Sequence, residues 1–173
     1  MLTLSSLTPS QVAEAVPDLA TILLDCVEGG ASVSFMADLT REGAEAFWRG
    51  VAQAAAEDGR AVLVARDEVG LVGVVEVIPA GPANQPHRAD VAKMLVHRRG
   101  RRQGIGEALM RTAEDAARTM GKTLLVLDTV TGHAGERLYA RLDWVRVGVI
   151  PDFAVFPDGS PCATTIFYKR IAP

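Results

Sequence analysis

The segment "HRRGRRQGIGEALM", residues 97–110, holds four arginines and three glycines in its first ten positions. The patterns on either side predict a strand before it and a helix after it. Backbone N–H groups in the first turn of a helix lack partners and attract anions. Gly104 and Gly106 would let a bulky anion approach them, because glycine has no Cβ atom. The arginines stay charged near neutral pH, so the segment predicts a cradle for a pyrophosphate group.

The spacing of the glycines distinguishes between known phosphate-binding motifs. A dinucleotide fingerprint beginning at Gly104 requires glycine or alanine where the chain has Leu109, and a Walker A loop beginning at Gly100 requires glycine where it has Ile105. Neither motif fits. Residues 101–106 do fit the pattern of Arg or Gln, two residues, Gly, one residue, and Gly or Ala. This pattern resembles the pyrophosphate loop with which the GNAT family of N-acetyltransferases binds acetyl-CoA.

Three further stretches resemble the same family in the same order. They are "DVAKMLV" (residues 90–96), similar to the family's fourth strand, "LLVLDTV" (124–130), similar to its fifth strand, and "ERLYARLDW" (136–144), similar to the Leu-Tyr motif of its fourth helix. Asp143 stands where that motif usually has glycine. Within the family, residues 128–159 most resemble the small bacterial acetyltransferases of the tabtoxin-resistance type.

The resemblance implies a fold and a set of cofactor contacts. The fold is an α/β fold with a mixed, mostly antiparallel and twisted sheet of about seven strands, splayed open between the fourth and fifth strands and flanked by about four helices. We expect a single domain over residues 1–173. The co-substrate is acetyl-CoA, without a metal ion. The residues expected to bind it are Met94, Leu95, Val96, Arg101, Arg102, Gln103, Gly104, Ile105 and Gly106.

Acetyl transfer from a thioester to an amine requires a polarised carbonyl, an unprotonated amine and a proton for the departing thiolate. In the family, the backbone of the fourth strand polarises the carbonyl, which here means residues 94–96. A tyrosine near the sulfur acts as the general acid, and Tyr139 matches it. The alternative for Tyr139 is a ring that only packs in the core.

Carboxylates in or beside apolar strands are the candidate bases, because partial burial can raise a carboxyl pKa toward the working pH. Asp90 begins the predicted fourth strand, where several family members carry a glutamate base, and Asp128 ends the predicted fifth strand beside the expected acceptor cleft. Glu76, inside "VGVVEVI", is a third candidate. The alternatives are a turn partner of Thr129 and Thr131 for Asp128, a solvated position for Glu76, and a proton relay through water.

Hydrophobic periodicity and turn residues predict the elements that position these groups. The expected order is one strand, two helices, three strands, a helix, a strand, a helix and two closing strands. In the helix over residues 105–120, Ile105 and Leu109 share the apolar face and Glu114 lies on the polar one. The near-continuous apolar run at residues 122–130 is typical of a strand covered on both faces.

The composition narrows the class of protein. A formal charge of -3 and a pI of about 5.6 give no field that would attract nucleic acid or an anionic membrane. Cys26 and Cys162 form neither a disulfide framework nor a zinc motif, and no histidine pair has metal-ligand spacing. No signal peptide and no run of about 18 apolar residues is visible. We therefore expect a cytoplasmic protein without nucleic-acid or membrane partners.

Together these features favour an enzyme, an acetyl-CoA-dependent N-acetyltransferase that acetylates a primary amine of a small molecule directly. The acceptors expected are amino-acid-like metabolites, antibiotics or toxins. The alternative is a non-catalytic sensor or regulatory module that keeps the acyl-CoA cradle. The loops over residues 26–40 and 157–163 should select the acceptor, but their residue types do not name one. Exposed apolar residues near the closing strands would permit a homodimer.

Overall fold

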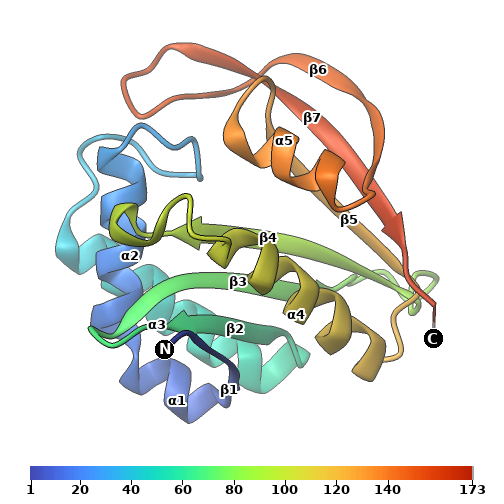
Figure 1. Cartoon of the computed structure of the whole chain (residues 1–173), viewed down its shortest axis with the longest axis horizontal. Helices are drawn as coiled ribbons and strands as arrows, with labels where there is room; N and C mark the ends of the chain where they lie inside the picture. Colours follow the sequence, from blue (N-terminus) through green and yellow to red (C-terminus); the bar gives the residue numbers. More distant parts are fainter. Residues whose placement is uncertain (173) are drawn as a thin grey trace.

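The computed structural model describes residues 1–172, which form a mixed sheet with helices on both faces (Figure 1). Its elements are β1 (Thr3–Leu7), α1 (Pro9–Glu14), α2 (Val16–Glu28), α3 (Arg41–Asp58), β2 (Ala61–Arg66), β3 (Leu71–Pro79), β4 (Arg88–Val96), the short 3-10 helix η1 (Arg98–Gly100), α4 (Ile105–Thr119), β5 (Leu124–Val130), α5 (Ala134–Arg141), β6 (Val145–Val155) and β7 (Pro161–Arg170). The sheet order is β1-β2-β3-β4-β5-β7-β6, and β4 and β5 are parallel. The predicted fold class is confirmed.

Several helix ends follow the sequence signals. Thr8 and Gln11 form a reciprocal capping box at α1, and Thr40 accepts a hydrogen bond from the backbone N–H of Gly43 at α3. The first predicted helix is divided into α1 and α2, because α2 starts again at Val16 with Pro17 in its first turn. Residues 1–172 therefore contain five α-helices where about four were expected.

The sheet opens between β4 and β5. These strands pair only at Arg88 with Leu124, Ala89 with Leu125, and Asp90 with Val126. In contrast, β3 follows β4 as far as Val96, and β7 pairs with β5 along its whole length. Beyond Asp90 the two halves of the sheet diverge, as Figure 1 shows. The splay predicted between these strands is confirmed, and it leaves an edge of β4 without a neighbouring strand.

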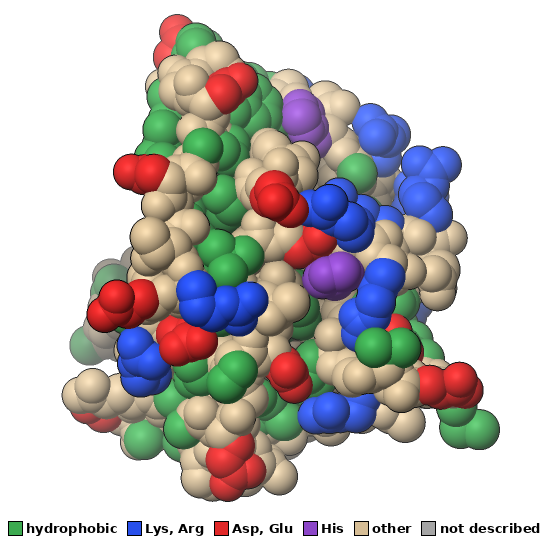
Figure 2. All heavy atoms as spheres, turned by 90° about the vertical axis from the view of Figure 1, so that its left-hand side faces the viewer, with side chains coloured by type: hydrophobic (Ala, Val, Ile, Leu, Met, Phe, Trp, Pro, Cys, Tyr) green, Lys and Arg blue, Asp and Glu red, His purple; other side chains and the backbone are tan. Residues whose placement is uncertain are grey.

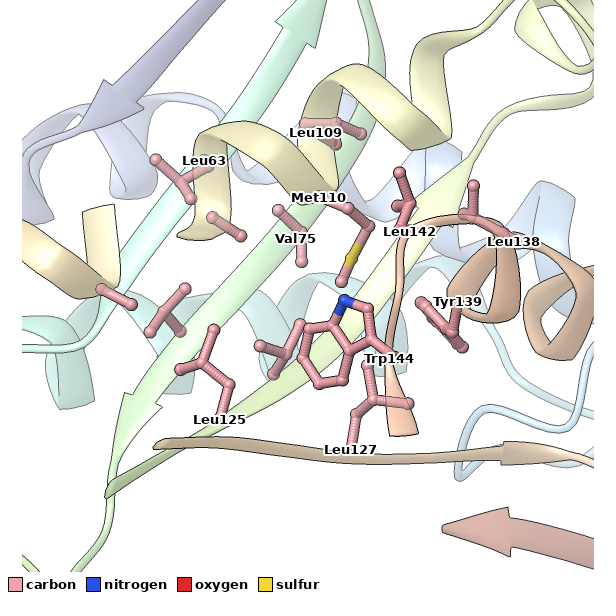
Figure 3. Packing of buried hydrophobic residues seen from close by; sticks show 14 of the residues in the cluster. Leu63, Val75, Leu109, Met110, Leu125, Leu127, Leu138, Tyr139, Leu142 and Trp144 are labelled. Carbon is pink, nitrogen blue, oxygen red and sulfur yellow. The ribbon is translucent and has the colours of Figure 1, made fainter. Parts of the chain in front are cut away.

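Two hydrophobic clusters cover the two faces of the sheet. One joins α1, α2 and α3 to the central strands, with Trp48 fully buried in it. The other joins α4 and α5 to the sheet, and Figure 3 shows the indole of Trp144 between Met110 of α4 and Leu127 of β5. No helix within residues 1–172 combines the length and the apolar character needed to cross a membrane.

The environment of β5 differs from the prediction. Only Leu125 and Leu127 are buried, Asp128 is exposed, and the other positions are partly buried. The cluster under α1, α2 and α3 reaches no further than β4, so the second face of β5 lacks the cover expected from its apolar sequence. The strand is apolar on one face and open to the splay on the other.

The polar face of α4 also differs from the prediction at Glu114. This side chain is 6% exposed, and its Oε1 accepts hydrogen bonds from Lys169 Nζ at 2.7 Å and from Trp144 Nε1 at 3.2 Å. Helical periodicity predicted a solvated position for Glu114. It could not show that Lys169 of β7 and Trp144, which follows α5, contact this side chain. The carboxylate instead connects α4 to β7 through Lys169 and to the end of α5 through Trp144.

We expect Glu114→Ala to lower the free energy of unfolding by about 3 kcal/mol, because it leaves the Lys169 ammonium and the Trp144 N–H without this partner. Urea denaturation followed by tryptophan fluorescence measures the change. Glu107→Ala is the matched control, since Glu107 forms an exposed pair with Arg111 on the same helix, worth less than about 0.5 kcal/mol. Equal losses in the two variants would show that burial adds nothing to the Glu114 pair.

Candidate active site

The predicted phosphate loop connects β4 to α4 and leaves the start of α4 open. Arg102 and Gly104 both adopt left-handed conformations, with φ of 66° and 79°. Gly104 is the N-cap residue of the 15-residue helix α4 and supplies no side-chain cap. A Cβ atom on Gly104 would meet no atom within 4 Å. An anion could therefore reach the first N–H groups of α4, where the helix dipole favours negative charge.

The other two glycines of the loop allow close packing. A Cβ atom on Gly106 would lie 3.2 Å from Leu138 Cδ2 of α5 and 3.8 Å from the side chain of Met94 of β4. A Cβ atom on Gly100 would lie 2.5 Å from Val72 Cγ2. Gly106 therefore brings α4, α5 and β4 together at one point, a role beyond the exposure of N–H groups that the sequence indicated.

Three of the four arginines in the loop face other parts of the protein. Arg99 donates to backbone carbonyls at the start of β3, at 2.8 and 3.2 Å. Arg98 and Arg101 both contact the carboxylate of Asp25 on α2. Arg102 is exposed and has no ion-pair or hydrogen-bond partner in the part of the chain described. The composition alone could not separate the one arginine without a partner from the three that are paired.

The predicted pantetheine edge, Met94 to Val96, lies on the diverging part of β4. Leu95 is buried under α1, α2 and α3, whereas Met94 and Val96 pack against the opposite cluster. The carbonyl of Val96 accepts a hydrogen bond from Arg101 Nε at 3.1 Å. The β3–β4 register shifts between Val74 and Glu76, so β4 has a bulge next to this edge.

Tyr139 projects from α5 into the core beside the splay and is 5% exposed. Its ring centroid lies 6.0 Å from that of Trp144 and 5.9 Å from that of Phe167. Its hydroxyl has no hydrogen-bond partner in residues 1–172, and burial raises its pKa, with the negative charge of Asp128 as a smaller cause. The ring packs in the core while the hydroxyl keeps its proton, so packing and acid catalysis are compatible roles.

The three candidate carboxylates occupy different environments. Asp128 is exposed on the diverging part of β5, and its Oδ2 accepts a hydrogen bond from Thr164 Oγ1 at 2.7 Å. Asp90 lies at the last β4–β5 pair and forms an ion pair with Arg88 on its own strand. Glu76 is 1% exposed and lies 3.1 Å from an Arg60 nitrogen.

Burial raises the pKa of Glu76, and the positive charge of Arg60 opposes that shift. The alternative considered for Glu76, a solvated position, is therefore wrong. The side chain is instead held in a buried ion pair, whose charge is compensated where it stands.

Lys93 lies on the diverging part of β4 beside the candidate site, and the sequence analysis did not single it out. It has φ of 48° at the β4 bulge, and its Nζ donates to Ser34 Oγ at 3.1 Å and lies 5.5 Å from the centre of the Phe47 ring. Burial lowers the pKa of Lys93, although the charges of Glu76 and Asp128 oppose the shift. A lone lysine inside an apolar strand was the only signal in the sequence.

The two loops expected to select the acceptor meet in the structure. The backbone N–H of Ala37 donates to the carbonyl of Pro157 at 3.1 Å, and Ser32 Oγ donates to the carbonyl of Val155 at 2.7 Å. A cleft of about 870 Å³ lies between α2, the α2–α3 loop and the β6–β7 hairpin. The residues that line it include Asp25, Glu28, Arg41, His97, His133, Phe156 and Asp158. Figure 2 shows this end of the molecule, where histidines lie among acidic and basic side chains. No group of three or more metal-ligating side chains is found in residues 1–172.

Comparison with known proteins gives one family and a consistent fold. A model described as the acetyltransferase (GNAT) family matches residues 20–144. The ribosomal-protein-alanine N-acetyltransferase of Brucella melitensis is 20% identical, with a TM-score of 0.80 over 98% of this chain and 99% of that one. A GCN5-related N-acetyltransferase from Kribbella flavida is 20% identical, with a TM-score of 0.79 over 98% of each chain. The phosphinothricin acetyltransferase of Sinorhizobium meliloti, in complex with AcCoA, is 16% identical, with a TM-score of 0.81 over 99% of this chain and 89% of that one.

Proposed function

The chain belongs to the acetyltransferase (GNAT) family, and we propose that it transfers the acetyl group of acetyl-CoA directly to a primary amine of a small molecule. The observation that supports this most is the meeting of three elements at Gly106. There the first turn of α4 approaches Leu138 of α5 and Met94 of β4. The anion-binding end of α4, the free edge of β4 and the residue before Tyr139 therefore lie close together.

The residues present fit acetyl-CoA. The open N–H groups of α4 and the outward Arg102 suit the negative charge of a pyrophosphate. The edge of β4 beyond Asp90 has no neighbouring strand, so its N–H and C=O groups suit the amides of a pantetheine arm. When bound, acetyl-CoA supplies the acetyl group as a thioester whose carbonyl carbon accepts attack by an amine. The fold shared with the AcCoA complex from Sinorhizobium meliloti agrees with this assignment.

In the proposed mechanism each group of the chain has one task. Within residues 94–96, the backbone N–H groups that point away from β3, toward the open edge of β4, polarise the acetyl carbonyl. Asp128 takes a proton from the acceptor amine, directly or through a water molecule. Tyr139 donates its hydroxyl proton to the departing sulfur, and its raised pKa keeps that proton in place at neutral pH. Asp128 suits the base better than Asp90, because Arg88 already neutralises Asp90 at the closed end of the splay.

The cleft of about 870 Å³ is the proposed entrance for the acceptor. The Ala37–Pro157 hydrogen bond joins its two walls, and its volume is typical of sites that bind small molecules. The resemblance to tabtoxin-resistance enzymes makes amine-bearing antibiotics and toxins, with amino acids, the first acceptors to test.

Two measurements on one sample test the proposed function. Isothermal titration with acetyl-CoA should show micromolar binding, and a thiol-release assay against a panel of small amines should show turnover with some of them. Binding of acetyl-CoA without thiol release in the presence of any small amine would favour the non-catalytic sensor. Thiol release only with peptide amines would change the proposed acceptor to a peptide or protein. No binding would refute the assignment of the acetyl-CoA site.

Within the same assay, Tyr139→Phe should lower turnover by about 10²-fold, the scale for loss of a general acid, while acetyl-CoA affinity stays unchanged. Tyr168→Phe, on β7, is the control with the same loss of a hydroxyl. Full activity of Tyr139→Phe would leave the ring with a packing role alone.

Gly104→Val should abolish acetyl-CoA binding in the titration. The β-branched side chain disfavours the left-handed conformation at this N-cap and fills the space in front of the α4 N–H groups. Gly59→Val is a matched control, because Gly59 has φ of 70° with nothing within 4 Å of its Cβ position and lies at the end of α3. Both variants should lose similar stability, whereas only Gly104→Val should lose the ligand.

Asp128→Asn should reduce kcat by about 10²-fold or more, since general-base catalysis contributes on that scale, and the loss should lessen as pH rises and more acceptor amine is unprotonated. Asp90→Asn should change kcat by less than about threefold. Steady-state rates from pH 6 to 10 with the best amine of the panel make the comparison. The reverse order of effects would assign the base to Asp90.

A further inference from the structure

A single buried carboxylate on α2 receives the loop that precedes α4. Asp25 is 7% exposed, and its Oδ2 accepts the backbone N–H of Arg98 at 2.8 Å. The Arg98 side chain donates to the other oxygen, Arg101 Nη2 lies 3.5 Å from Oδ2, and His97 Nε2 lies 3.5 Å from Oδ1. A carboxylate so enclosed is stable only with such partners. Asp25 thus joins residues more than 70 positions away in the sequence.

These contacts set the direction of two arginines. Arg101 donates through Nε to the carbonyl of Val96 at 3.1 Å, and its guanidinium lies 3.5 Å from the Cβ position of Gly29 at the end of α2. Arg98 is held by Asp25 on one side and by Glu28 at 2.6 Å on the other. Both cations are therefore turned toward α2, and Arg102 alone of the arginines in the described loop is left without a protein partner.

The same contacts fix the backbone just before the phosphate loop. The N–H of Arg98 belongs to the first residue of η1, a position that has no partner within its own turn. Asp25 supplies that partner, and His97 Nδ1 accepts from the N–H of Arg99 at 3.2 Å. A loop that must present N–H groups to an anion gains affinity when its conformation is set beforehand.

We propose that Asp25 is a positioning residue for the donor site. It acts through Arg98 and Arg101 to hold residues 97–101 against α2, so that the N–H groups of α4 and the Arg102 side chain face the pyrophosphate. Arg101, although it stands at the first position of the loop motif, belongs to this support rather than to the ligand contacts. The inference rests on the proposed function for its ligand, but the contacts themselves do not depend on it.

The variant Asp25→Asn tests the proposal, because it keeps the shape of the side chain and removes its charge. Hydrogen exchange of the peptide spanning residues 97–104, measured without ligand, should become at least about tenfold faster. The Kd for CoA, measured by titration, should rise by about tenfold or more, because a loop that is no longer preorganised must be ordered when the ligand binds. In the thiol-release assay the KM for acetyl-CoA should rise by a factor similar to that of the Kd.

Glu28→Gln is the matched control, because Glu28 also pairs with Arg98 but its side chain is 76% exposed. It should leave the exchange rate and the Kd almost unchanged. Unchanged exchange in a folded Asp25→Asn variant overturns the proposal, whatever the chain binds. Faster exchange in a protein whose wild type does not bind CoA would refute the proposed function and leave the positioning role standing.

Arg101→Gln provides a second variant, on the exposed side of the same contact, in case Asp25→Asn does not fold. If Arg101 acts through Asp25, Arg101→Gln alone should speed exchange in residues 97–104, and the double variant should weaken CoA binding no more than Asp25→Asn does. Additive losses of affinity in the double variant, or weaker binding by Arg101→Gln with unchanged exchange, would show that Arg101 contacts the pyrophosphate directly and would overturn the proposal.

Discussion

The parting of β4 from β5 after three register pairs is the constraint on which the remaining structure depends. Parallel strands normally satisfy each other's backbone groups, and an unpaired strand edge inside a protein is costly. Each half of the sheet is held together separately, since β4 stays paired with β3 and β5 with β7 along their other edges. The splay can therefore persist without unfolding either half, and it offers N–H and C=O groups to a ligand in place of a strand.

The elements beside the splay are held by side chains from distant parts of the chain. Trp144 and Tyr139 fill the core under α5, and Glu114 connects α4 to β7 through Lys169. On the opposite face, Lys93 connects β4 to Ser34 in the α2–α3 loop. Two residues in left-handed conformations, Lys93 and Ser34, thus meet where β4 faces the α2–α3 loop. Such backbone strain persists only where surrounding contacts fix it, and it concentrates at functional sites.

The sequence predicted most of the fold because its signals are local. The capping box at Thr8, the glycine stop at Gly59 and the loop motif at residues 101–106 each depend on a few neighbouring residues. The burial of Glu114, the contact of Lys93 with Ser34 and the pairing of three arginines depend on partners 28 to 76 residues away in the sequence. Local periodicity does not record such distant partners. The sequence predicted the same role for all four arginines, that of adding positive charge to the loop. In the described chain only Arg102 has no protein partner.

The distribution of charge resolves why a chain of net charge -3 carries so basic a loop. Three of the four arginines in the loop are paired within the protein, with Asp25, Glu28, Asp67 and backbone carbonyls. What the loop leaves unpaired is one guanidinium, that of Arg102, and the partial charges of an uncapped helix. Helix N–H groups are fixed in direction and cannot follow an arbitrary anion, whereas a cluster of free arginines could bind any polyphosphate or nucleic acid. Internal pairing of the other arginines thus converts a basic segment into a directional site.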